Sequence, residues 1–114
     1  MAMTAPAERF NFAEHLRLRN AGRHDKPAYV DDQETLSYGQ LAARVGRFAA
    51  ALTAQGIRRE ERVLLLMHDC TDWPVAFLGS LHAGVVPVAV NTLLTADDYA
   101  YMLEHSRSQV AIVS

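Results

Sequence analysis

The sequence predicts an α/β fold with a partly parallel sheet and flanking helices. The run Arg62–Met67 is continuously apolar and has the length of a strand buried on both faces. Apolar residues at helical spacing follow it, and segments with strand and helix patterns then alternate to residue 113. Such alternation implies βαβ units, whose crossover connections make neighbouring strands parallel.

Composition indicates a soluble globular chain of one domain or part of one. Of its 114 residues, 50% are hydrophobic and 21% charged, which is enough apolar material for a core. A net charge of −2 and scattered arginines exclude the basic surface typical of nucleic-acid or membrane binding. Cys70 is the only cysteine, and no apolar run has membrane-spanning length. We therefore expect a cytoplasmic protein.

The first residues are expected to form a flexible tail over 1–9, and the folded unit to span 10–114. Asn11 can cap a first helix that runs to about Asn20, and Gly22 is expected to end it. The inward face of this helix is expected to hold Phe12, Ala13 and Leu16.

Two short strands, Pro27–Val30 and Thr35–Tyr38, predict a β-hairpin whose turn holds Asp31, Asp32 and Gln33. Adjacent carboxylates could also serve acid–base catalysis, but no partner group is in view. Aspartates between short strands are common turn formers, because their side chains bond to the backbone a few residues on. We interpret both as turn residues.

Ser37 and Gln40 stand at capping-box spacing and predict a long helix that Gly56 ends. Apolar residues at spacings of three and four give this helix one packing face, and Arg44 lies outside it. The packing face consists of Leu41, Val45, Phe48, Ala49 and Leu52. The mixed charges of Arg58–Arg62 then predict a solvated loop.

The next helix follows the strand Arg62–Met67. Thr71 or Asp72 caps it, Pro74 lies in its first turn, where proline loses no hydrogen bond, and Gly84 closes it. Its expected inward face holds Val75, Leu78 and Leu81.

A further strand is predicted at Val85–Val90, and Pro87 within it favours an edge position. Thr95 and Asp98 open the last helix at capping-box spacing. Its buried face is expected to hold Tyr99, Met102 and Leu103. The final strand is predicted at Gln109–Val113.

The loop His68–Asp69–Cys70 is the strongest candidate for catalysis, because sites in open α/β sheets form at the carboxyl ends of strands. It contains a nucleophile, a base and an acid, so a small cysteine hydrolase using Cys70 is one hypothesis. Three consecutive loop side chains diverge, however, whereas a triad needs convergent groups. We favour a loop that lines a surface or a domain interface.

The other candidate residues show no pattern that predicts a site. No histidine lies at a metal-ligand spacing from cysteine or acidic residues. The histidines concerned are His15, His24, His82 and His105. Tyr99 and Tyr101 are expected on different helix faces, with one in the core rather than in a stacking platform.

No phosphate-binding motif is present. The glycines form neither G-x-G-x-x-G nor a P-loop, and the only lysine, Lys26, precedes Pro27 in an expected turn. The residues themselves therefore predict no catalytic, cofactor-binding or metal site in this chain.

Several strings, in order and at matching intervals, resemble the N-terminal region of the adenylate-forming acyl-CoA ligases. Thr35–Leu41 is similar to the family's L-[TS]-Y-x-[EQ]-L, which begins its first long helix, and Glu61–Leu66 to its D-R-V strand start. Ala76–Val88 resembles the family's helix followed by A-G-x-x-x-x-P, and Asn91–Leu94 the loop before its next helix. The resemblance covers residues 10–114.

Three further strings, Phe10–Ala13, Asn20–Arg23 and Asn91–Tyr99, resemble benzoate-CoA ligases and related aryl-CoA ligases. This resemblance implies an N-terminal part of the large domain of the acyl-CoA synthetase fold. It also implies a parent enzyme that uses ATP and Mg²⁺ to convert benzoate or a related aryl carboxylate to an acyl-adenylate. The thiol of coenzyme A then displaces AMP.

The family's phosphate loop, adenine and acyl-pocket segments and C-terminal domain would lie beyond residue 114. Residues 10–114 are therefore expected to be an incomplete N-terminal subdomain that is inactive and structural by itself, with the remainder of the ligase chain as its partner. No catalytic residue is carried over. Some relatives have a basic residue after Asn91 that could meet a phosphate of coenzyme A, but here Leu93 and Leu94 stand there.

The alternative is a free-standing, non-catalytic α/β interaction module. Such a module would need finished edges and a surface without large apolar patches, so it should be monodisperse and should not bind a hydrophobic dye.

Overall fold

The computed structural model describes Thr4 and residues 8–114, so most of the predicted tail over 1–9 lies outside the described residues. The elements in chain order are α1 (Phe12–Arg19), β1 (Pro27–Val30), β2 (Thr35–Ser37), α2 (Tyr38–Ala54), β3 (Arg62–Leu66), α3 (Asp72–His82), β4 (Val86–Ala89), α4 (Ala96–Ser106) and β5 (Ser108–Val113). Among the described residues, no helix combines the length and the apolar character needed to cross a membrane.

The strands form two separate sheets. β1 and β2 pair as an antiparallel hairpin, and β3 lies between β4 and β5 in a three-stranded parallel sheet. The predicted hairpin and parallel sheet are therefore confirmed, although as two sheets rather than one partly parallel sheet. Pro87 lies on β4, an edge strand of the parallel sheet, as its missing N–H predicts.

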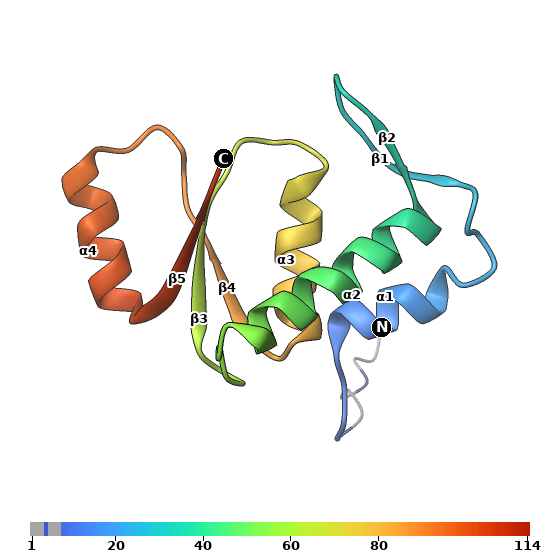
Figure 1. Cartoon of the computed structure of the whole chain (residues 1–114), viewed down its shortest axis with the longest axis horizontal. Helices are drawn as coiled ribbons and strands as arrows, with labels where there is room; N and C mark the ends of the chain where they lie inside the picture. The colour runs from blue at the N-terminus through green and yellow to red at the C-terminus, as the bar shows by residue number, and fades with distance from the viewer. Residues whose placement is uncertain (1–3, 5–7) are drawn as a thin grey trace.

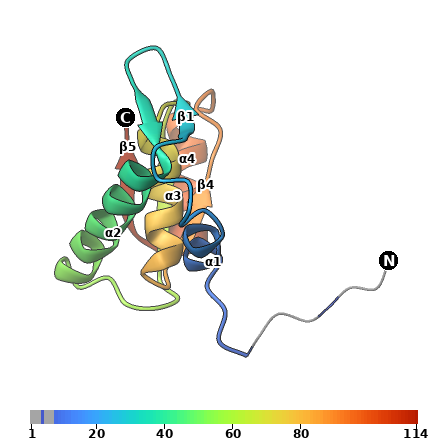
Figure 2. The ribbon, with the colours of Figure 1, turned by 90° about the vertical axis from the view of Figure 1, so that its right-hand side faces the viewer.

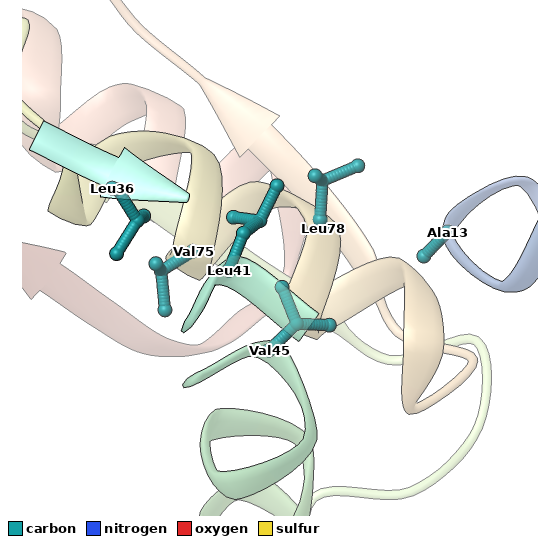
Figure 3. Close-up of a cluster of buried hydrophobic side chains, with 6 residues drawn as sticks. All are labelled: Ala13, Leu36, Leu41, Val45, Val75 and Leu78. Carbon is teal, nitrogen blue, oxygen red and sulfur yellow. The ribbon is translucent and has the colours of Figure 1, made fainter. Parts of the chain in front are cut away.

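Helix α3 lies at the centre of the packing. Figure 1 shows α3 and α4 on opposite sides of the parallel sheet, with α2 and α1 beyond α3. One side of α3 contributes to a cluster of buried side chains, drawn in Figure 3, that joins α1, β2 and α2: Ala13, Leu36, Leu41, Val45, Val75 and Leu78. Another side contributes to a second cluster over the sheet: Leu52, Val63, Leu65, Met67, Ala76 and Val85.

The sequence predicted one inward face for α3, and this was incomplete. Ala76, Gly79 and Ser80 are also buried, because the helix is packed between α2 and the sheet. Ser80 is 0% exposed, and its hydroxyl donates to the carbonyl oxygen of Ala76 at 2.7 Å. Small residues and an internally bonded hydroxyl allow a helix to be enclosed on two sides without an unpaired polar group.

The predicted helix ends are mostly confirmed. The capping boxes that begin α2 and α4 are both formed, at Ser37 and Thr95. Gly56 and Gly84 follow α2 and α3 with φ of +82° and +78°, the left-handed conformation that glycine adopts most readily. Tyr38, predicted as strand, is instead the first residue of α2.

Helix α1 ends at Arg19 with Asn20 as its C-cap, close to the predicted end, and differs from the prediction at one position. The Asn20 side-chain amide donates to the carbonyl oxygen of Leu16 at 2.8 Å. Phe12 is 47% exposed, so its predicted inward position is wrong, while Ala13 is buried and Leu16 half-buried as predicted.

The predicted buried face of α4 is also corrected. Tyr99, Met102 and Leu103 are only half-buried, and no residue in Ala96–Ser106, all of which are described, is fully buried. The helix lies on one side of the parallel sheet and packs against β5, and this contact leaves its apolar residues only partly covered.

A polar network attaches the hairpin to the first residues of α3. The Oδ1 atom of Asp31 accepts hydrogen bonds from the backbone N–H groups of Gln33 and Glu34, both at 2.8 Å, which confirms the predicted turn. Its Oδ2 atom accepts the backbone N–H of Thr71 at 2.8 Å, 40 residues along the chain. One carboxylate thus closes the turn and anchors the helix start.

Glu34 completes the network. Its carboxylate accepts two hydrogen bonds from the guanidinium of Arg44, at 2.7 and 3.0 Å, and one from the hydroxyl of Thr71 at 2.6 Å. Thr71 is 4% exposed, so its polar groups need these partners. Thr71 occupies the predicted cap position, but its hydroxyl donates to Glu34 and does not cap α3.

These contacts favour the ionised carboxylates. The hydrogen bond from the Thr71 N–H is the largest cause of the lowered pKa of Asp31, with smaller contributions from Glu34 and Gln33. The Arg44 guanidinium, and then the Thr71 hydroxyl, lower the pKa of Glu34.

Replacing Asp31 with asparagine should weaken the network, because an amide keeps one acceptor oxygen for the turn but turns an NH₂ group toward the Thr71 N–H. In the unfolded chain an aspartate has a pKa of about 3.9, and above that pH the ionised Asp31 carboxylate stabilises the fold fully. This stabilisation is lost as pH falls through the lowered pKa of Asp31 in the folded state. We expect Asp31→Asn to lower the free energy of unfolding at pH 7. Between about pH 5 and pH 2, the free energy of unfolding of the variant should fall less steeply with decreasing pH than that of the original chain, as measured by urea denaturation.

The exposed neighbour Asp32 provides the matched control. Asp32→Asn should leave both the free energy of unfolding at pH 7 and its pH dependence nearly unchanged. Equal responses of the two variants would contradict the network.

Two helix-interior glycines should respond oppositely to alanine. A Cβ atom on Gly46 meets nothing within 4 Å, so Gly46→Ala should raise the free energy of unfolding by about 0.5–1 kcal/mol. On Gly79 the Cβ would lie 2.6 Å from Phe48 Cδ1 and 3.0 Å from Phe48 Cβ. Overpacking of about 1–3 kcal/mol should outweigh the helix gain there, so Gly79→Ala should destabilise. Urea denaturation giving both changes the same sign would contradict the close packing of α2 on α3.

Candidate functional site

An open crevice of about 400 Å³ lies at the carboxyl ends of β3 and β4. The chain leaves β3 toward α3 on one side of the sheet and leaves β4 toward α4 on the other (Figure 1). Such divergence leaves a gap at the strand ends, where open α/β sheets bind ligands. The polar residues at its walls are His68, Asp69, Asn91 and Thr92, with Trp73 beside them.

The loop that follows β3 forms one wall. His68 and Asp69 are exposed and line the crevice, whereas Cys70 is half-buried and does not line it. The loop is held by its backbone: the His68 N–H donates to the Ser114 hydroxyl at 2.9 Å. Among the hydrogen bonds of the described residues, none joins the side chains of this trio, so the structure does not bring together a cysteine triad.

The loop that follows β4 forms the other wall. The Tyr99 hydroxyl donates to the Asn91 carbonyl oxygen at 2.7 Å and accepts the Leu94 N–H at 3.0 Å. The Asn91 side-chain oxygen accepts the Leu93 N–H at 2.8 Å. Tyr99 therefore fastens this loop rather than filling a core, and Leu93 is left 87% exposed.

The remaining sequence candidates lie away from the crevice. His82 Nδ1 is 3.9 Å from Glu14 Oε2, and the rings of His105 and Tyr101 stack with centroids 5.3 Å apart. The ring of His15 lies beside that of Phe10. His24 and Lys26 are exposed near the hairpin. Within Thr4 and residues 8–114, no group of three or more His, Cys, Asp or Glu side chains could hold a metal ion.

The crevice can orient a polar group, but it lacks the arrangement that chemistry requires. A nucleophile needs a base within hydrogen-bond reach, and the side chains of its walls show no such pair among the described contacts. The carboxylates with lowered pKa do not line the crevice: Asp31 and Glu34 hold the far end of the β3–α3 loop, and Glu14 pairs with Arg17 on α1.

Comparison with known proteins gives one family. The AMP-binding enzyme family matches residues 16–114. The chain is 48% identical over 110 residues to the benzoate–CoA ligase of Thauera aromatica, covering 94% of this chain and 21% of the ligase. It is 43% identical over 111 residues to the 4-hydroxybenzoate–CoA/benzoate–CoA ligase of Rhodopseudomonas palustris, covering 96% of this chain and 21% of that protein. It therefore spans about a fifth of the length of these curated relatives.

The structural comparison agrees. A crystal structure of a benzoate CoA ligase from Burkholderia xenovorans LB400 superposes with a TM-score of 0.91 and 52% identity, over 92% of this chain and 22% of the ligase. The match to a family profile and to relatives above 30% identity extends through nearly the whole chain. The chain belongs to the AMP-binding enzyme family.

Proposed function

We propose that this chain is the N-terminal portion of an ATP-dependent aryl-CoA ligase that acts on benzoate or a related aryl carboxylate. The observation that carries the proposal is the similarity to benzoate–CoA ligases in both sequence and fold, which covers 94% of the chain in sequence and 92% in structure. Such a ligase would serve aromatic acid degradation in the cytoplasm.

The role proposed for these residues is framework. ATP, Mg²⁺ and coenzyme A would act in the complete ligase, but the described residues do not fit them: the one lysine, Lys26, is exposed, and no acidic cluster suits a metal ion. The aliphatic side chains of Leu93 and Leu94 cannot pair with a phosphate. We therefore assign no catalytic, cofactor-binding or metal residue in this chain.

The crevice between β3 and β4 would then face the remainder of the ligase chain. Hydrogen bonds between the backbone and the side chains of Ser114 and Tyr99 hold its walls, and the loop after β4 presents the exposed side chain of Leu93 beside it. An apolar side chain on a fastened loop suits a surface that another part of the protein covers.

A chimera tests the proposal directly. The 114 residues would replace the matching segment of the Thauera aromatica benzoate–CoA ligase. We expect the chimera to catalyse benzoate-dependent exchange of pyrophosphate into ATP and the 114-residue chain alone to catalyse none, because the framework of one ligase should support the site of another.

A Cys70→Ser version of the chimera should retain this exchange, since no role in the chemistry falls to that thiol. Exchange by the isolated chain, or a folded chimera without exchange, would overturn the proposed function. Loss of exchange in the Cys70→Ser chimera with its fold intact would restore the hypothesis that Cys70 is catalytic.

A further inference from the structure

No further inference is drawn: the strongest candidate, the apolar hollow between α1 and α2 where they flank α3 (Figure 2), carries none, because Arg17 in its lining already donates to both carboxylate oxygens of Glu14 and nothing in the structure shows what occupies the hollow.

Discussion

The enclosure of α3 on two sides is the constraint on which the rest of the structure depends. Ala76 and Ser80 let the helix approach the sheet and satisfy its one buried hydroxyl, and Gly79 lets it approach Phe48 of α2. Packing at interior density tolerates little change of volume at such positions. The hairpin is attached to the start of α3 through Thr71, and α1 to its end through Leu81. The hairpin, α1, α2 and the parallel sheet are therefore all placed relative to this helix.

This arrangement supports the proposal that the chain acts as framework rather than as a site. The residues that make long-range polar contacts, such as Asp31 and Glu34, use their charges to fix elements together. The residues that remain exposed at the strand ends, His68 and Asp69, have no partner among the described side-chain contacts with which to share a proton. Membership of a fold family therefore does not by itself give this segment a function. A function would have to be argued from the side chains that the segment contains.

Local sequence signals predicted most of the fold because their physics is local. Capping boxes at Ser37 and Thr95, glycines with positive φ, and the apolar run of β3 act within a few residues. Contacts between distant segments left no such signal. Thr71 was predicted to cap α3, but its hydroxyl donates to Glu34 instead. The apolar face of α4 was predicted to be buried, but its residues are only half-buried. Tyr99 holds the loop after β4 through its hydroxyl, which bonds to the backbone of Asn91 and Leu94. The spacing of residues in the sequence does not specify the loop conformation that these bonds require.

Native-state hydrogen exchange tests the central place of α3 most directly. Helices enclosed on two sides should open only with the whole fold, whereas a helix without a fully buried residue opens locally. The backbone amides of α3 and β3 should therefore exchange slowest and with the same opening free energy, and those of α4 should exchange through a smaller local opening. Amides of α4 as protected as those of α3, or α3 opening before β3, would contradict this account.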